Sequence, residues 1–259
     1  IRERALLHLS EVIVHAVVTV PAHYTDLKRA DIREAAKIAG YESVRLITEP
    51  VAAAIAYGIS RNEGERTVLT YDFGGGTFDA SVLDLDGKVF QVAATGGDPF
   101  LGGVDFDDRI MGHLLLEFFK REGINLSSDF PAMVRVAAKA ERAKRELSER
   151  NEVRIAIPFV TVRDGKGVTL DVTLTRAKME ELCADLVERT LAACDAVLAQ
   201  AGLSVSDLDE VVLVGGMTRV PLVHRRVEEH FGKPPRKGVH PDEAVALGAA
   251  LFADSLGRD

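Results

Sequence analysis

The chain has 259 residues, 47% of them hydrophobic, which is enough for one large or two modest domains with a sizeable buried core. Its 40 acidic and 32 basic residues give a formal net charge of −8, which argues against nucleic acid or an anionic membrane as a partner. The longest apolar run, at 51–59, is far shorter than the roughly 20 residues of a membrane-spanning helix. We therefore expect a soluble globular protein.

The cysteine content and the N-terminus give expectations about location and completeness. Cys183 and Cys194 fall within one predicted helix, about 16 Å apart, which is beyond disulfide reach. Two free thiols and the lack of a charged and apolar leader predict a reducing, cytoplasmic location. Because the chain begins at Ile1 inside a predicted helix, we expect its N-terminus to be a cut end.

Short β-branched runs alternate with segments of helical periodicity, which is typical of an α/β layered domain. In chain order, the patterns first predict a strand at 17–20, a helix at 27–39 with Ile38 on its inner face, and strands at 68–71 and through 85. They then predict helices at 105–122 and 131–150 and strands at 153–157 and 168–174. A helix at 175–202 and a strand at 211–214 follow. The hairpin at 153–174, with its flanking helices, predicts an outer subdomain inserted into the main layer.

The two ends of the chain share an order of elements. The strand at 17–20 is followed by a helix and then by a Pro-led, Ala-rich helix at 49–58, and the strand at 211–214 is followed by the same series, ending at 241–250. Any two strand–helix units in an α/β protein look somewhat alike. The repeat nevertheless suggests two related lobes.

The strongest motif is Asp-Phe-Gly-Gly-Gly-Thr-Phe-Asp at 72–79, between two predicted strands. Three glycines at a hairpin tip leave backbone N–H groups open to phosphate oxygens. Asp72 and Asp79 would repel a phosphate unless a hard cation intervenes, so we expect Mg²⁺ held largely through its waters. Thr77 would offer a hydroxyl to the phosphoryl group or the attacking water. The alternative is a plain hairpin turn with solvated aspartates.

Two weaker patterns could contribute to the same chemistry. The pair Gly215-Gly216 follows an apolar strand and opens a helix, as an anion site does. Spacing places four side chains on one face of the helix at 131–150, where they could hold a ribose and stack an arginine on a base: Glu141, Lys144, Arg145 and Ser148. Spacing alone favours a solvated face with intrahelical ion pairs.

Other chemistries lack their motifs. The sequence contains no Gly-x-x-x-x-Gly-Lys-Ser/Thr phosphate loop, no Gly-x-Gly-x-x-Gly and no Gly-x-Ser-x-Gly. The seven histidines are scattered without the spacing of metal ligands, so no zinc site is expected.

Seven segments together carry a resemblance to a known family: VVTVPAHYTD at 17–26, ITEPVAAAIAYG at 47–58, YDFGGGTFD at 71–79, GGDPFLGGVDFD at 96–107, ERAKRELS at 141–148, VVLVGGMTRVP at 211–221 and HPDEAVALGAALFA at 240–253. In this order and spacing they resemble the ATPase domain of the DnaK family of seventy-kilodalton heat-shock chaperones. The resemblance implies an α/β, actin-like ATPase fold with two ribonuclease-H-like lobes around a nucleotide cleft. It assigns 1–65 to the end of lobe I, 66–102 and 186–259 to the base of lobe II, and 103–185 to an inserted α+β outer subdomain.

The resemblance also implies roles for individual residues. Asp72, Thr77, Asp79 and Glu49 are the implied catalytic residues, with Asp72 on Mg²⁺ through water and Asp79 on K⁺ or a water. The implied nucleotide-binding residues are Gly74, Gly75, Gly76, Thr77, Glu141, Lys144, Arg145, Ser148, Gly215, Gly216, Arg219 and Asp242. Pro21 and Arg29 match positions that relay the nucleotide state towards a peptide-binding domain.

The chain departs from the family pattern. Val104 and His240 stand where the family usually has Glu and Asn, and the first change removes a carboxylate near the interlobe edge. The family's first phosphate loop and catalytic lysine lie upstream of the region that Ile1 matches, and the chain stops before the interdomain linker and the peptide-binding domain. We therefore expect an N-terminally truncated fragment that binds ATP or ADP but is not an efficient ATPase alone.

The partners follow from the same resemblance. In the intact protein they are a J-domain co-chaperone, a nucleotide exchange factor and unfolded peptide. A truncated lobe I would leave the strand at 17–20 exposed, which predicts a homodimer through this strand. The competing hypothesis is a non-catalytic lobe II module for docking or self-association. A sugar kinase or another actin-like relative is disfavoured by the segments at 141–148 and 214–221.

Overall fold

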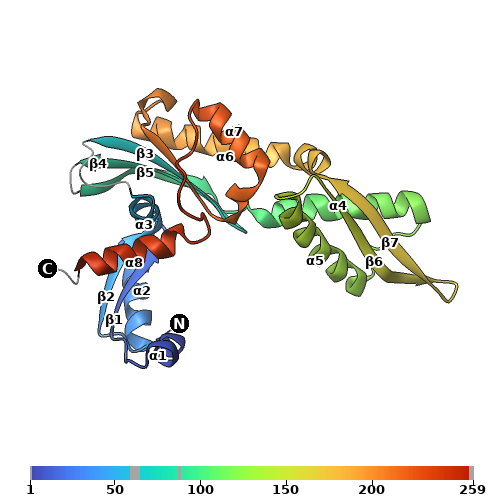
Figure 1. Cartoon of the computed structure of the whole chain (residues 1–259), viewed down its shortest axis with the longest axis horizontal. Helices are drawn as coiled ribbons and strands as arrows, with labels where there is room; N and C mark the ends of the chain where they lie inside the picture. The colour runs from blue at the N-terminus through green and yellow to red at the C-terminus, as the bar shows by residue number, and fades with distance from the viewer. Residues whose placement is uncertain (1, 59–64, 87–88, 257–259) are drawn as a thin grey trace.

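The computed structural model describes residues 2–58, 65–86 and 89–256. The molecule is elongated, with its N-terminal elements and a long β-hairpin at opposite ends (Figure 1). Between them lies a four-stranded sheet covered by helices on both faces. The alternation of strands and helices confirms the predicted α/β class.

The N-terminal elements form a small parallel pair of strands with helices beside it. They are α1 (Arg2–Leu9), β1 (His15–Val20), α2 (Asp26–Ile38) and β2 (Ser43–Thr48), and β1 pairs with β2 in parallel. Thr25 caps α2 by accepting a hydrogen bond from the Lys28 N–H. The expectation that Ile38 faces inward is wrong: its side chain is 81% exposed, because no other described element covers that face of α2.

The central sheet has the strand order β5-β4-β3-β8. Its strands are β3 (Arg66–Phe73), β4 (Phe78–Asp86), β5 (Val89–Asp98) and β8 (Glu210–Val214); β4 is antiparallel to β3 and β5, and β8 is parallel to β3. Alternate side chains of β3 face opposite ways, so Leu69 and Tyr71 join the large core under α6 while Val68 joins a second core under α3. The sheet is therefore buried on both faces.

The outer unit extends away from this sheet (Figure 1). It consists of α4 (Gly103–Glu122), α5 (Phe130–Leu147), β6 (Glu152–Arg163) and β7 (Lys166–Thr175), and the two strands form an antiparallel hairpin. Asp129 caps α5 through the Ala132 N–H at 3.0 Å. Apolar side chains at helical spacing, such as Phe106 and Ile110 on α4, form its core.

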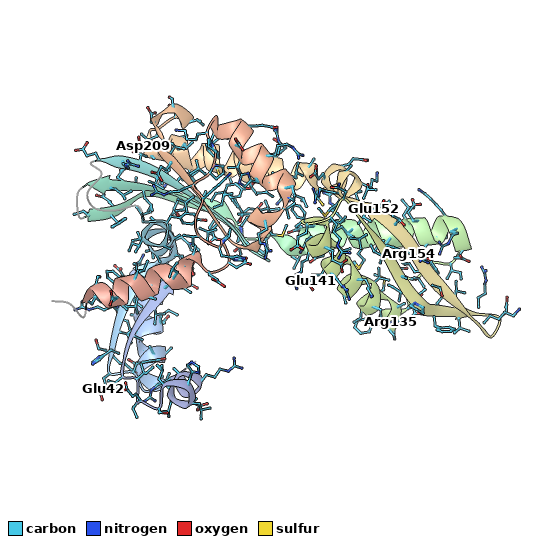
Figure 2. All side chains as sticks on the ribbon, in the orientation of Figure 1. Glu42, Arg135, Glu141, Glu152, Arg154 and Asp209 are labelled. Atoms are coloured by element: carbon cyan, nitrogen blue, oxygen red, sulfur yellow. The ribbon has the colours of Figure 1, made fainter. Side chains whose placement is uncertain are left out.

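Charged side chains cover the outer unit and fasten its surface elements together (Figure 2). Arg135 on α5 donates to the carbonyl oxygens of Pro158 at 2.6 Å and Phe159 at 2.8 Å, where β6 is bulged. Arg154 on β6 pairs with Asp171 on β7. The Arg135 contacts hold the hairpin against α5, and the Arg154–Asp171 pair joins its two strands.

Helix α6 (Arg176–Ala201) joins the outer unit to the central sheet and contains both cysteines, which are free and buried. The predicted boundary at 185/186 falls inside this continuous helix. The proposed division into lobe and subdomain ranges stays a prediction.

The two Ala-rich helices of the predicted repeat cross each other between the small and the large sheet (Figure 1). They are α3 (Glu49–Ala56) and α8 (Ala244–Leu256), and a Cβ atom on Gly248 would clash with the Ala52 carbonyl oxygen. The short helix η1 (Val205–Asp207) precedes β8. Between β8 and α8 lie η2 (Gly216–Arg219) and α7 (Pro221–Phe231). Residues 232–243 contain no strand equivalent to β2, so the repeat is only partial.

Candidate functional site

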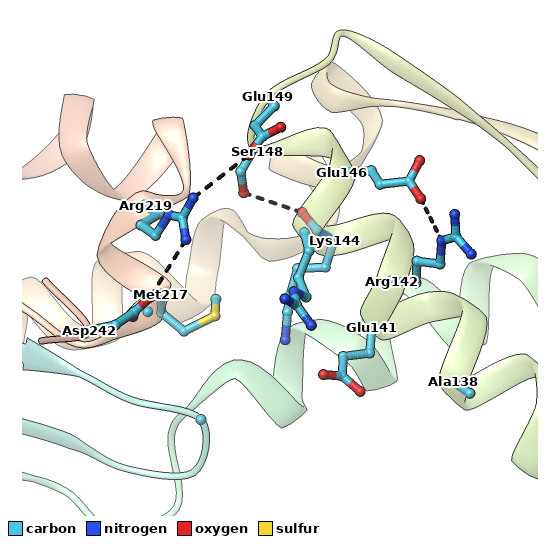
Figure 3. Close-up of a pocket in the computed structure, with 13 residues that line it drawn as sticks. Ala138, Glu141, Arg142, Lys144, Glu146, Ser148, Glu149, Met217, Arg219 and Asp242 are labelled. Carbon is cyan, nitrogen blue, oxygen red and sulfur yellow. Dashed lines mark hydrogen bonds and ion pairs between the residues drawn. The ribbon is translucent and has the colours of Figure 1, made fainter. Parts of the chain in front are cut away.

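A large cleft opens between α5 of the outer unit and the turn that follows β8 (Figure 3). Its volume is about 790 Å³. The residues that line it are Gly75, Ala138, Glu141, Arg142, Lys144, Arg145, Glu146, Ser148, Glu149, Gly216, Met217, Arg219 and Asp242. The cleft thus brings together the predicted helix face, Gly216 of the second glycine pair and one glycine of the strongest motif.

The glycine loop between β3 and β4 is held in place by backbone hydrogen bonds. Gly74 donates to the Thr77 carbonyl at 3.0 Å, while the carbonyls of Gly74 and Gly75 accept from the first N–H groups of α4 at 3.1 and 2.9 Å. The space that a Cβ would occupy on Gly75 and Gly76 is open, whereas a Cβ on Gly102 would clash with the Gly76 backbone. The loop is therefore fixed by its contacts with α4, and no side chain covers the backbone at Gly75, which lines the cleft.

The opposite wall is organised around Arg219. One of its terminal nitrogens lies 3.6 Å from Asp242 Oδ2, and the other lies 3.7 Å from Glu149 Oε1 (Figure 3). A Cβ on Gly216 would lie 2.8 Å from Asp242 Oδ1, so only glycine leaves this carboxylate where it is. The guanidinium is half-exposed and bridges the turn after β8 to the end of α5.

The face of α5 is only partly free to meet a ligand. Glu141 and Arg145 are exposed, and the Ser148 hydroxyl donates to the Lys144 carbonyl at 3.3 Å. Lys144 is almost buried and binds the Gly103 carbonyl and Asp107 on α4. Arg142 and Glu146 on this helix form an intrahelical ion pair, which the alternative interpretation predicted. Neither residue belongs to the four side chains of the predicted ligand-binding face.

A second, acidic pocket lies at the carboxyl end of β3, and its volume is about 20 Å³. The residues that line it are Pro21, Ala22, Glu49, Pro50, Thr70, Asp72, Asp79, Ser81, Thr95 and Val214. Asp72 lies close to the turn after β8, because a Cβ on Gly215 would lie 2.8 Å from Asp72 Oδ1, and the next residue, Gly216, lines the cleft. Gly74, Gly76, Thr77 and Gly215 adjoin these spaces without lining either one.

Three carboxylates share the acidic pocket, and no lysine or arginine of the described residues lines it. Burial raises the pKa of Asp72 to about 7, and Glu49 and Asp79 add to this effect. Burial also raises the pKa of both other carboxyls. A hydrogen bond from Thr77 and the nearby His23 lower the pKa of Asp79 in part. The pocket therefore holds negative charge that its own lining does not neutralise.

This donor set suits a hard cation. Carboxylate oxygens are the ligands that Mg²⁺ prefers, and Mg²⁺ usually keeps several of its waters. In the described part of the chain, no three His, Cys, Asp or Glu side chains are grouped closely enough to bind a metal directly. The residues present therefore fit an ion held through water better than a closed protein cage.

The predicted relay residues adjoin the acidic pocket. Pro21 lines it at the end of β1. Arg29 on α2 donates to the carbonyls of Tyr24 at 2.9 Å and Ala22 at 3.3 Å, so it fastens the loop that follows Pro21.

Sequence reasoning missed several neighbours of these sites. His23 Nδ1 lies 3.7 Å from Asp79 Oδ1, and the hydroxyls of Ser81 and Thr95 meet at 2.9 Å beneath the carboxylates. Met217 lines the cleft beside Gly216. Ser81 and Thr95 carry hydroxyls at strand positions where apolar residues would be usual, and this pattern could have indicated a polar pocket. No local pattern linked His23 to Asp79.

Comparison with known families identifies this arrangement. A family model described as Hsp70 protein matches residues 1–258 of the 259-residue chain. The chain belongs to the Hsp70 protein family. The predicted resemblance is confirmed at this level, whereas assignment to the DnaK branch stays a prediction. Membership gives this Hsp70 chain an actin-like ATPase fold, nucleotide binding and the role of a chaperone ATPase domain.

The family match covers every part of the candidate site. The glycine loop, the acidic pocket and the cleft all lie within the matched residues of this Hsp70 chain. Among the helices that the structure describes, none is both long and apolar enough to cross a membrane.

Proposed function

We propose that this Hsp70 chain binds ATP and ADP with Mg²⁺ in the large cleft, and that its nucleotide state controls the binding of unfolded polypeptides in a DnaK-like chaperone. One observation carries the proposal. The cleft joins a bare glycine loop at one end to a wall of hydrogen-bonding and cationic side chains at the other. A ligand with phosphates at one end and a nucleoside at the other matches this polarity.

The roles within the cleft follow from chemistry. The backbone of Gly74, Gly75 and Gly76 would bind phosphate oxygens, with Thr77 beside them. Glu141, Lys144 and Ser148 offer hydrogen bonds to a sugar, and either Arg145 or Arg219 offers a guanidinium plane to a base. The set is completed by Gly215, Gly216 and Asp242, which shape the wall around Arg219.

The acidic pocket would serve the phosphoryl chemistry. Asp72 would hold Mg²⁺ through water, and Asp79 with Glu49 would order K⁺ or the attacking water. The metal would neutralise phosphate charge when bound. Because no lysine or arginine in the described part of the chain lines this pocket, we expect slow turnover by the chain alone.

Further parts of the proposal concern partners and location. Pro21 and Arg29 would relay the nucleotide state to a peptide-binding domain, and a J-domain co-chaperone and a nucleotide exchange factor would act on the cycle. A homodimer through β1 is a separate proposal, supported by the open edge of this short sheet in the described residues. Two free, buried cysteines suit a cytoplasmic location.

Isothermal titration calorimetry with ATP and ADP, with and without Mg²⁺, tests the proposal. We expect binding heat that depends on Mg²⁺ and is lost in Asp72→Asn. The control, Asp31→Asn, changes an exposed carboxylate on α2 and should bind as the unchanged chain does. Absence of nucleotide heat in the unchanged chain would support a non-catalytic interaction module instead.

A further inference from the structure

A buried ion pair lies directly beneath the nucleotide cleft. Lys144 Nζ on α5 donates to Asp107 Oδ2 and to the Gly103 carbonyl oxygen on α4, each at 2.9 Å. The side chains of Lys144 and Asp107 are 10% and 18% exposed. Lys144 nevertheless contributes to the lining of the cleft, whereas Asp107 does not. The carboxylate therefore holds the ammonium from the side away from the cleft.

This pair is poorly explained by stability alone. Asp107 Oδ1 is buried and has no hydrogen-bond partner among the residues that the structure describes. Burial raises the pKa of Asp107 even though Lys144 lowers it in part. Burial therefore destabilises the ionised carboxylate more than the ion pair with Lys144 stabilises it. A buried ion pair is often no more stabilising than apolar side chains of the same volume, and an unpaired oxygen adds a further cost. A role in ligand binding would account for its presence.

The geometry leaves one donor of the ammonium for a ligand. A lysine ammonium has three N–H groups, and two are used by Gly103 and Asp107. No third partner of Lys144 occurs among the residues that the structure describes. A Cβ on residue 103 would lie 2.9 Å from both Lys144 Nζ and Met217 Sδ, so glycine at this position makes room for the ammonium.

We propose that Asp107 is a positioning residue for nucleotide binding. It fixes the ammonium of Lys144 so that the remaining N–H donates to a hydroxyl of the ligand's sugar, next to Glu141 and Ser148. This inference rests on the proposed nucleotide-binding function. Asp107 itself does not touch the ligand, and its effect passes through Lys144.

Calorimetry with two ligands tests this role. ADP and 2′,3′-dideoxy-ADP differ only in the sugar hydroxyls. In Asp107→Asn, which keeps the volume of the side chain, we expect ADP to bind about tenfold more weakly, because a charge-assisted hydrogen bond loses its fixed geometry. The dideoxy ligand should change by less than about twofold. Asp108→Asn, at the exposed neighbour on α4, is the matched control and should leave both affinities unchanged.

A second variant shows whether Asp107 acts through Lys144. Lys144→Met should weaken ADP binding, and adding Asp107→Asn to it should cause no further loss of ADP affinity. If Asp107→Asn weakens both ligands equally, or weakens ADP by the same factor in the presence and absence of Lys144, the positioning role is wrong.

A readout without nucleotide separates this inference from the proposed function. In nitrogen-15 NMR spectra of the lysine ammonium groups, the Lys144 signal should be visible in the unchanged chain, because its protons are held, and should be lost in Asp107→Asn. An unchanged Lys144 signal would overturn the positioning role. Loss of that signal in Asp107→Asn, together with no ADP heat in the unchanged chain, would overturn nucleotide binding and with it the role of the pair in binding.

Discussion

Asp72→Asn should make this Hsp70 chain more stable, by an amount that grows with pH, while it abolishes Mg²⁺-dependent nucleotide binding. Burial and two neighbouring carboxylates raise the pKa of Asp72 from 3.8 to about 7. A carboxyl whose pKa is raised on folding keeps its proton more tightly in the folded state. Its contribution to stability is therefore lost as pH rises from about 4 through about 7.

The size of the effect follows from the pKa difference. One pKa unit corresponds to about 1.4 kcal/mol, so ionisation of Asp72 costs the folded state about 4 kcal/mol at pH 8 and about 2 kcal/mol at pH 5. Asparagine has a similar volume and carries no charge. Asp72→Asn should therefore raise the free energy of unfolding by up to these amounts, in nucleotide-free buffer with EDTA.

Urea unfolding followed by circular dichroism at pH 5, 6.5 and 8 measures this difference. The control Asp31→Asn, on the exposed surface of α2, should shift the free energy of unfolding little at any of these pH values. A stabilisation by Asp72→Asn that stays constant with pH, or a loss of stability at pH 8, would refute the reasoning. The expected result would show that the ionised carboxylate of Asp72 lowers the stability of the folded chain.

Three further substitutions test the packing around the site. Gly248→Ala should lower the free energy of unfolding by about 1–3 kcal/mol, since the added Cβ would clash with the Ala52 carbonyl where α8 crosses α3. Gly112→Ala, exposed on α4 with open space around it, should instead raise it by about 0.5–1 kcal/mol, and a loss here would contradict the helix argument. Tyr57→Phe should cost about 1 kcal/mol, because the buried hydroxyl donates to the Leu213 carbonyl at 2.7 Å. Urea midpoints measure all three, and a neutral Gly248→Ala would show that the helices can separate freely.

Local patterns predicted most elements of the fold and one part of the site. The helix expected at 131–150 is α5 at Phe130–Leu147, and the hairpin expected at 153–174 is β6 and β7. These elements could be predicted because the helical and strand periods and the capping residues all lie within a few positions of each other. The glycine loop at 74–76 could be read for the same reason, since its bare backbone depends only on its own residues.

Contacts between distant segments could not be read in this way. Ile38 has the spacing of an inward-facing residue, yet it is exposed, because whether a helix face is buried depends on what packs against it. Lys144 was expected to face a ligand, and most of its ammonium is instead occupied by α4, at the distant Asp107. The residue pattern of α5 would be the same whether Lys144 faced a ligand or paired with Asp107.

By itself, the sequence determined the α/β class, the positions of most helices and strands, the glycine loop and the family resemblance, because these depend on short segments and their order. Only the tertiary structure decided how charge is distributed in the acidic pocket. Glu49, Asp72 and Asp79 come together from α3, β3 and β4, and their raised pKa values arise from shared burial. Proximity and desolvation of this kind are properties of the packed chain, and no local pattern of residues encodes them.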